Sequence, residues 1–435
     1  MSTSSIHNPI GRRLTLGGLC ALLLLVAAAG ISSISRVTIG WDGSQTDGLS
    51  RHFQLAKNGC LISVMSDATN LVPDDTNGLR DVFVIDTKRD ETLRVSVSSS
   101  GEQADGASNS GALADNGRYI AFHSEATNLV PGDTNGVNDV FVHDLKKRTT
   151  WRISVASDGT QADGGSAWPA ISRSGRYVAF RSGATNLVPG DTNGVADVFV
   201  HDLNSGTTIR PSLTTSGEEP NGDSIRHAMS NNGRYIAVLS TATNVVPGDT
   251  NGHADVFVHD LKTKKTTLVS VGHAGDMANG GNFQPVFSGN ARYVGFGSYA
   301  TNLVPGDTNA VTDVFVYDMK SGAMDRCSLN SFGQEGNGDC GVVALSSNGR
   351  LVYFDSLATN LVPDDLNDAR DVFVHDRKTN TTERLSVSKD GAESNGDSLR
   401  PRIAKNGKIV AIFSSADNLV PGDTNGVADV FVIER

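Results

Sequence analysis

Acidic and amide side chains recur along the chain at one fixed spacing and offer oxygen atoms to a cation. In one copy, Asp133, Asn135 and Asp139 stand at positions 1, 3 and 7 of a loop, and a backbone carbonyl near Val137 adds another oxygen. Calcium prefers about six to eight oxygen ligands, so this set makes part of a calcium site, without the glutamate that usually completes one. The alternative is a turn held by hydrogen bonds from asparagine and aspartate, with Gly136 in the left-handed conformation.

The same three residue types occur seven times, and each copy begins 58 residues after the one before it. A period this regular, with no insertion, indicates one repeated supersecondary unit. The fifth copy has Ala310 in place of the glycine, and the sixth has Leu366 and Asp368 in place of threonine and glycine. The predicted calcium ligands are Asp75, Asn77, Asp81, Asp133, Asn135, Asp139, Asp191, Asn193, Asp197, Asp249, Asn251, Asp255, Asp307, Asn309, Asp313, Asp365, Asn367, Asp371, Asp423, Asn425 and Asp429.

Each repeat contains four short β-segments, which in the second repeat are residues 94–97, 111–114, 118–122 and 139–143. β-branched and aromatic residues dominate the last two segments, and polar turns separate the segments from one another. The two central strands are continuously apolar, without the alternation of a half-exposed strand, so both faces of the sheet must be covered. An antiparallel four-stranded unit that stacks between identical neighbours, like the blade of a β-propeller, has this property.

The two ends of the repeat array predict a closed ring. Residues 36–39 lie 58 residues before residues 94–97, so the array begins with the fourth strand of a blade, whereas residues 429–432 end it with a third strand. If the N-terminal strand completes the last blade, no sheet edge stays unpaired. A linear solenoid is the alternative, but it would leave the last unit one strand short. We therefore predict an all-β, closed seven-bladed β-propeller that forms a single domain over residues 31–435.

One sequence motif points to a known family. Residues 169–182, with the sequence PAISRSGRYVAFRS, and the corresponding Pro285 and Pro401 resemble the WD40-like (PD40) repeat of TolB-like propellers. The resemblance extends over nearly all of residues 36–435. It implies a propeller fold, which is also found in tricorn-like and prolyl-oligopeptidase-like proteases and in some pectin-degrading lyases. We recognise neither the additional N-terminal domain of TolB nor a hydrolase domain in these residues, so the resemblance does not choose among those activities.

A second set of candidate residues lies where the repeats stop resembling one another. Strand order places the loop between blades (residues 98–109) and the loop between the second and third strands (residues 125–138) on one face. Just before the innermost strand on this face, equivalent positions hold His52, Ser110, Trp168, Arg226, Gln284, Val342 and Arg400. Such groups would meet at the mouth of the central channel. Polar, aromatic and cationic groups in a concavity form the default ligand site.

We predict that five of these residues bind a ligand: His52, Trp168, Arg226, Gln284 and Arg400. The two arginines favour an anionic group such as a carboxylate, and the tryptophan can stack on a sugar or another ring. The alternative is a solvated channel mouth whose side chains carry no function.

Other reactive side chains give weaker indications. His143, His201, His259 and His375 occupy one position in four separate blades, so we expect partly exposed strand-end histidines and no shared metal. The sequence contains no nucleophile elbow, zinc signature or phosphate loop. Cys327 and Cys340 are close enough in sequence to pair in an oxidising compartment, which would leave Cys60 alone; three isolated thiols are the alternative.

Residues 1–30 have the features of a signal peptide. Arg12 and Arg13 precede an apolar run over residues 14–26, and small residues follow at 27–30. We expect cleavage and export to the periplasm or the extracellular space, with no membrane span left after cleavage; an uncleaved anchor is the alternative. The formal net charge of -11 argues against nucleic acid as a partner, because phosphate binding requires a basic patch.

The sequence as a whole predicts an exported, monomeric binding or scaffold protein that calcium stabilises. We expect a protein or a glycan as its ligand. The long-loop face would hold this ligand, and the part of the ligand at the ring axis would be anionic. The rival prediction is a propeller enzyme, a polysaccharide lyase or hydrolase, with an axial active site. A deep axial funnel lined by an acid, a base or metal ligands would favour the enzyme, and a flat loop face would favour the scaffold.

Overall fold

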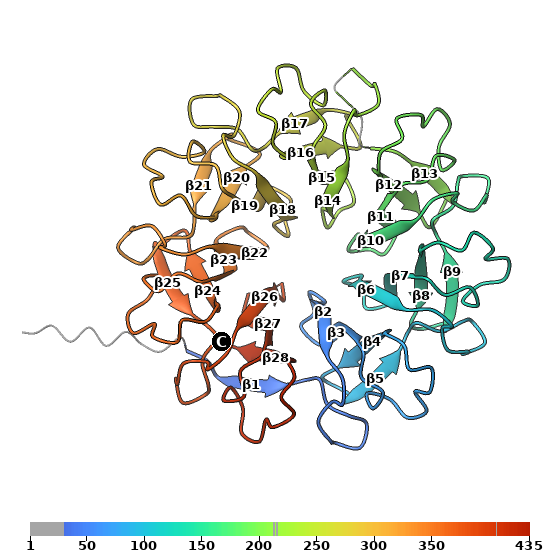
Figure 1. Cartoon of the computed structure of the whole chain (residues 1–435), viewed down its shortest axis with the longest axis horizontal. Helices are drawn as coiled ribbons and strands as arrows, with labels where there is room; N and C mark the ends of the chain where they lie inside the picture. The colour runs from blue at the N-terminus through green and yellow to red at the C-terminus, as the bar shows by residue number, and fades with distance from the viewer. Residues whose placement is uncertain (1–29, 212–213, 215, 406) are drawn as a thin grey trace, which may run out of the picture.

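Seven antiparallel sheets of four strands each form a ring around a central axis (Figure 1). The computed structural model describes residues 30–211, 214, 216–405 and 407–435, so the predicted signal peptide lies outside the described residues except for Gly30. The described residues form strands and no helix, and accordingly no helix that is long and apolar enough to cross a membrane. The prediction of an all-β, closed seven-bladed propeller is confirmed.

Each blade runs outward from an innermost to an outermost strand (Figure 1). The innermost strands are β2 (Ser50–Leu55), β6 (Ser108–Leu113), β10 (Ser166–Ile171), β14 (Ser224–Met229), β18 (Asn282–Phe287), β22 (Cys340–Leu345) and β26 (Ser398–Ile403). The second strands are β3 (Leu61–Ser66), β7 (Tyr119–Ser124), β11 (Tyr177–Ser182), β15 (Tyr235–Ser240), β19 (Tyr293–Ser298), β23 (Leu351–Ser356) and β27 (Ile409–Ser414). The third strands are β4 (Asp81–Asp86), β8 (Asp139–Asp144), β12 (Asp197–Asp202), β16 (Asp255–Asp260), β20 (Asp313–Asp318), β24 (Asp371–Asp376) and β28 (Asp429–Glu434). The outermost strands are β5 (Glu91–Arg94), β9 (Thr149–Arg152), β13 (Thr207–Ile209), β17 (Thr266–Leu268), β21 (Met324–Arg326), β25 (Thr381–Arg384) and β1 (Ser33–Arg36).

The hydrophobic core lies between the blades and continues from one blade to the next. In the second blade, Phe122 of β7 and Phe141 of β8 are fully buried, with ring centres 5.7 Å apart. Val82 and Val84 of β4, in the preceding blade, belong to the same cluster. Burial of apolar surface on both faces of each sheet explains why the central strands lack an alternating pattern.

The ring closes through β1, as predicted. This strand pairs antiparallel with β28, from Ser33 opposite Glu434 to Arg36 opposite Phe431, and completes the sheet of β26, β27 and β28. The predicted strand, residues 36–39, was placed three residues too late. Beyond Arg36, Val37 N still donates a hydrogen bond of 2.9 Å to the carbonyl oxygen of Val430. The Thr38 hydroxyl then replaces the backbone: it donates to Asp429 and accepts a hydrogen bond of 3.1 Å from Val430 N.

The loops between blades fasten neighbouring blades together on the long-loop face. Gln103, in the loop between the first and second blades, donates a hydrogen bond of 2.7 Å from Nε2 to the carbonyl oxygen of Asp74 in the first blade. Its own carbonyl oxygen accepts one of 2.8 Å from Asn128 Nδ2 in the second blade. These bonds confirm that the two classes of long loop share one face. They also hold the acidic loops in a fixed position, as a binding face requires.

Candidate functional site

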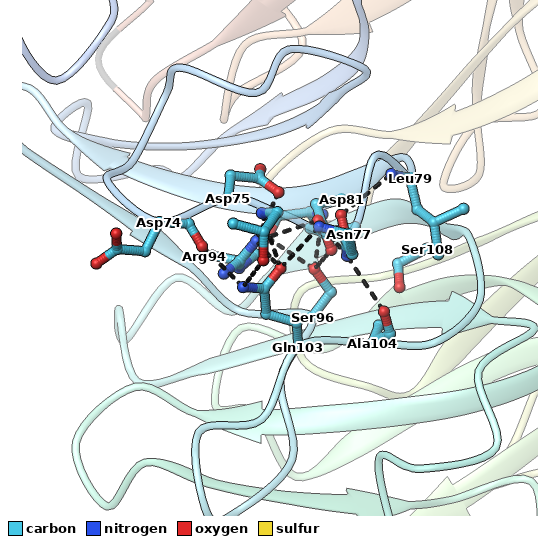
Figure 2. A network of polar contacts seen from close by, with 12 residues as sticks. Asp74, Asp75, Asn77, Leu79, Asp81, Arg94, Ser96, Gln103, Ala104 and Ser108 are labelled. Atoms are coloured by element: carbon cyan, nitrogen blue, oxygen red, sulfur yellow. Dashed lines mark hydrogen bonds and ion pairs between the residues drawn. The ribbon is translucent and has the colours of Figure 1, made fainter.

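The acidic loop of each blade connects its second and third strands. Figure 2 shows the loop of the first blade, where the side chains of Asp75, Asp81 and Arg94 converge. Arg94 Nη1 lies 2.8 Å from Asp75 Oδ1 and 3.5 Å from Asp81 Oδ2. It also donates a hydrogen bond of 3.1 Å to Oε1 of Gln103. A guanidinium group therefore supplies positive charge at the place where the sequence predicts calcium.

Hydrogen bonds within this loop form the turn that the sequence allowed as the alternative. Asn77 Oδ1 accepts a hydrogen bond of 3.0 Å from Leu79 N, and Gly78 between them has a φ of 64°. Asn77 Nδ2 donates to Asp81 Oδ2 at 3.0 Å, and Ser96 Oγ donates to Asp81 Oδ1. Both oxygens of Asp81 are thereby engaged, and the carboxylate is fixed at the start of β4.

An arginine takes part in the same arrangement in six of the seven blades. Its Nη1 lies 2.8–3.3 Å from the first aspartate of the loop and 3.0–3.6 Å from the second. The six residues stand at the ends of the outermost strands: Arg36, Arg94, Arg152, Arg210, Arg326 and Arg384. Sequence reasoning missed this role, although these arginines recur with the same 58-residue period as the aspartates. In the fourth blade Leu268 occupies the position.

In the sixth blade, the acidic loop and the following loop between blades bring three acidic side chains together in a way that fits a metal ion. Oxygens of Asp365, Asp371 and Glu393 lie within 4.8 Å of one another, and within the described part of the chain no other group of three or more histidine, cysteine or acidic side chains does so. Arg384 contacts all three: its Nη1 lies 3.3 Å from Asp365 Oδ1 and 3.4 Å from Asp371 Oδ2, and it forms an ion pair with Glu393. The triad offers the oxygen ligands of a metal site, and the guanidinium group of Arg384 contacts all three carboxylates.

Burial makes these carboxylates weaker acids. Burial, with the neighbouring charge of Asp371 as the next cause, raises the pKa of Asp365 to about 6, and Arg384 opposes this rise. Burial followed by the second aspartate of the loop likewise raises the pKa of Asp133 and of Asp307 to about 6. The first aspartate of the loop thus depends on a nearby positive charge to stay ionised.

The predicted axial residues lie beside a β-bulge in each innermost strand. The ladder between β10 and β11 shifts register between Ala167 and Ala170, on either side of Trp168, and corresponding shifts occur in five other blades. In the fourth blade the shift lies between Ser224 and Arg226, and Arg226 stays paired with Leu239. Trp168 and Arg400 have φ angles of 60° and 56°, as Ser110 does at 53°. Bulges of this kind redirect a side chain away from the regular ladder. The backbone therefore presents these side chains separately from the packed blade.

Several axial residues from different blades interact. Arg226 Cζ lies 4.3 Å from the ring centre of Trp168, and the ring of His123 lies 6.0 Å from that of Trp168. Burial is the main cause that lowers the pKa of His52 to about 3, and the charges of Arg402, Arg400 and Arg226 contribute to the same shift. Gln284 and Val342 are half-buried at the same positions of the fifth and sixth blades.

The inner edge of the ring carries an excess of positive charge. Among the described residues, Arg226, Arg400 and Arg402 have no acidic partner within ion-pair distance. Burial, with the charge of Arg400 as the next cause, lowers the pKa of Arg402 to about 10, which leaves it charged at neutral pH. The nearest carboxylate, that of Asp355, is already bonded to Arg370 at 3.2 Å and to the backbone N of Arg400 at 3.1 Å.

Sequence reasoning missed an aromatic patch in the fifth blade. Phe283 of β18 and Tyr299, which follows β19, are exposed and form an edge-to-face pair with ring centres 5.1 Å apart. Leu357, at the position of Tyr299 in the next blade, is also exposed. The sequence does contain a signal for this patch. Tyr299 is an aromatic residue at the position where other blades carry Glu125 or Gly183.

The strand-end histidines differ from their predicted state, because they are buried rather than partly exposed. His143 Nδ1 lies 2.8 Å from Thr150 Oγ1, and the Thr150 hydroxyl donates to the carbonyl oxygen of Val97. Because the hydroxyl proton of Thr150 is used in that bond, Nδ1–H of His143 must donate to the hydroxyl oxygen. The outermost strand and the loop between blades cover these rings. His201, His259 and His375 make the corresponding contact.

The three cysteines of the described chain are free thiols. Cys327 and Cys340 lie buried in one hydrophobic cluster and are not joined. Burial raises the pKa of each to about 12, which makes both thiols unreactive. The alternative of isolated thiols therefore holds in this structure.

Comparison with known proteins identifies relatives by structure alone. No family model matches the chain, and no curated protein matches it in sequence. The chain is similar to oligogalacturonate lyase in complex with manganese, with 10% identity over 94% of each chain and a TM-score of 0.57. It is similar to oligogalacturonate lyase from Vibrio parahaemolyticus, with 10% identity over 92% of this chain and 96% of that chain and a TM-score of 0.56. TolB from Acinetobacter baumannii has 12% identity over 91% of this chain and 81% of that chain, with a TM-score of 0.39. At 10% identity the lyase likenesses show a shared fold, in agreement with the propeller described above.

Proposed function

We propose that this protein is an exported, monomeric β-propeller that binds an anionic ligand, a protein or a glycan, at the inner edge of its long-loop face. One observation carries the proposal: Arg226 of β14 and Arg400 and Arg402 of β26 stand in two different blades without an acidic partner among the described residues. Unpaired arginines in one region favour a carboxylate or another planar anion. Export rests on the leader sequence in residues 1–30.

The neighbouring side chains suit a ligand that has a flat face as well as a charge. Trp168 lies against Arg226 and offers a large aromatic surface, and Phe283 of β18 and Tyr299, directly after β19, add exposed rings in the fifth blade. Aromatic rings stack on sugar rings or on apolar side chains. His52 remains neutral at pH 7, because burial and the surrounding arginines lower its pKa, so it adds hydrogen bonding without charge.

The test is direct binding of two anionic probes, an oligogalacturonate and an acidic peptide, measured by calorimetry. The double variant Arg226→Ala and Arg400→Ala should lose about tenfold or more in affinity for each arginine, since charged hydrogen bonds contribute about 1.5–3 kcal/mol. Affinity should also fall as salt concentration rises. A matched control, Arg234→Ala and Arg292→Ala, removes two arginines that pair with Asp260 and Asp318 at strand ends remote from the long loops. Undiminished affinity in the first variant would discard the axial site.

A propeller enzyme, a polysaccharide lyase or hydrolase with an axial active site, is the second candidate. The observations that favour it are the likeness to oligogalacturonate lyase over 94% of the chain and the unpartnered ring nitrogens of His52, His123 and His227 near the axial arginines. A lyase abstracts a proton next to a carboxylate and leaves a carbon–carbon double bond in the product. Incubation with oligogalacturonate, followed by ultraviolet absorbance for that double bond and by a reducing-sugar assay for hydrolysis, separates this function from binding alone.

Calcium stabilisation is also part of the proposal. The acidic triad of Asp365, Asp371 and Glu393 has the oxygen donors of a metal site, but Arg384 already supplies positive charge to it, as the arginines of five other loops do. A metal ion is therefore needed most where that arginine is missing.

A further inference from the structure

The fourth blade departs from the repeat at two positions around its acidic loop. Leu268 ends β17 where the other outermost strands of the ring supply an arginine to the loop. Met277 stands where the other blades place a glutamine or a glutamate, such as Gln103 or Glu219. In the first and third blades these side chains accept a hydrogen bond from the arginine. The fourth blade has thus exchanged both the cation and its partner for apolar side chains.

The two aspartates of this loop are nevertheless retained and buried. Asp249 is 6% exposed and Asp255 is 0% exposed. Oδ1 of Asp249 is buried and has no hydrogen-bond partner and no ion pair among the described residues. The equivalent Oδ1 atoms of Asp75 and Asp307 each contact an arginine, at 2.8 and 3.2 Å. Asp249 therefore presents an unsatisfied oxygen where its counterparts meet a positive charge.

The second aspartate is held in place by the surrounding loop. Asp255 Oδ1 accepts hydrogen bonds from Ser270 Oγ at 2.6 Å and from Asn282 Nδ2 at 3.2 Å, and Oδ2 accepts one of 2.8 Å from Asn251 Nδ2. Oδ1 of Asn282 is a further buried oxygen without a partner among the described residues. Both carboxylates belong to a preformed loop whose tip, at Gly252 and His253, is exposed. The exposed tip therefore borders oxygens that the surrounding loop holds in fixed positions.

Two buried carboxylates without a counter-charge repel each other, and either a proton or a cation must neutralise them. The donors are all oxygen atoms and two are carboxylates, which is the ligand type that hard divalent ions select. We propose that the fourth-blade loop binds one hard divalent cation, most simply calcium, through Asp249 and Asp255, in place of the guanidinium of the other blades. This site is independent of the axial binding proposed above.

The experiment rebuilds the missing arginine and, separately, removes one that is present. Calcium stoichiometry is measured by equilibrium dialysis, and thermal stability is measured with calcium and with a chelator. The wild-type chain should bind one ion, and calcium at about 100 times its Kd should raise the ratio of folded to unfolded protein about 100-fold. The double variant Leu268→Arg and Met277→Gln, which copies the first blade, should bind none and should melt higher than wild type in chelator.

Two further variants keep the test decisive. Arg210→Leu with Glu219→Met copies the fourth blade into the third, and it should raise the stoichiometry to two ions per chain. Asp249→Asn removes one carboxylate with little change in shape, so it should stay folded, lose calcium binding and no longer respond to chelator. Binding of an oligogalacturonate or an acidic peptide at the axis should be the same in all of these variants, which separates the two proposals.

Three results would overturn the cation site. The first is a wild-type chain that binds no calcium and melts at the same temperature with and without chelator. The second is a calcium response that survives intact in the Leu268→Arg and Met277→Gln variant. The third is wild-type stability that changes only with pH and not with calcium, which would show that a proton neutralises Asp249.

Discussion

Replacement of His143 by isoleucine should remove one source of acid sensitivity without harming the blade at neutral pH. The histidine is 1% exposed, and its Nε2 is buried without a hydrogen-bond partner among the described residues. Burial, with the charge of Arg148 as a smaller cause, lowers the pKa of His143 to about 4. The chain already places Ile85 and Ile433 at this position in the first and last blades, beside the same type of ladder. An isoleucine therefore fits the site.

The size and sign of the effect follow from the two pKa values. The folded-state pKa lies below the ordinary histidine value of 6.5, so the stability contributed by His143 is present above pH 6.5 and is lost as the pH falls toward 4. Below pH 4 the whole contribution of His143 to the free energy of unfolding, about 3 kcal/mol, is lost. At pH 5 about 2 kcal/mol of this contribution is already lost. Asp133 acts in the opposite direction, because its raised pKa of about 6 makes it less destabilising as the pH falls. The contribution of His143 is therefore obtained from the difference in the free energy of unfolding between wild type and variant.

The assay is the free energy of unfolding of both proteins in denaturant, measured from pH 4 to pH 8. At pH 8 we expect similar stabilities, and at pH 5 the variant should gain about 2 kcal/mol relative to wild type. His273→Asn is the matched control, since this histidine is exposed and its loss should leave the difference flat. Parallel curves for wild type and His143→Ile across the whole range would refute the argument that burial keeps this ring neutral.

Other predictions concern the ring and its turns. Deletion of residues 31–38 removes β1 and exposes the edge of β28, so we expect a markedly lower Tm and self-association at high concentration; an unchanged Tm and a monomeric variant would disprove closure through β1. Ala310→Gly should stabilise the protein by about 1 kcal/mol, because Ala310 has a φ of 56° and the left-handed conformation costs a residue with a Cβ about 1–2 kcal/mol. The reciprocal Gly136→Ala, at a φ of 65°, should destabilise by a similar amount, and thermal melting of both variants checks the pair.

The periodicity of the sequence determined the architecture. A 58-residue period, counted from Asp75 to Asp423, sets the number of blades, and the position of the fourth-strand residues at the N-terminus predicts the closure that β1 and β28 make. These features could be predicted because each blade packs against a copy of itself, so the same pattern must recur wherever the same contact recurs. The period also predicted which face carries the long loops, since strand direction alternates along an antiparallel sheet.

Tertiary structure decided which charges and rings meet. Arg152 lies 13 residues after Asp139 in the chain, and only the pairing of β9 with β8 returns its guanidinium to the acidic loop. Loop spacing alone cannot distinguish that partner from a calcium ion, because both offer a positive charge to the same oxygens. The burial of His143 likewise depends on Thr150 and on the carbonyl of Val97, which is 53 residues from that threonine. The contact between Trp168 and Arg226 joins two blades, so it arises from the curvature of the ring, a property that no single repeat encodes.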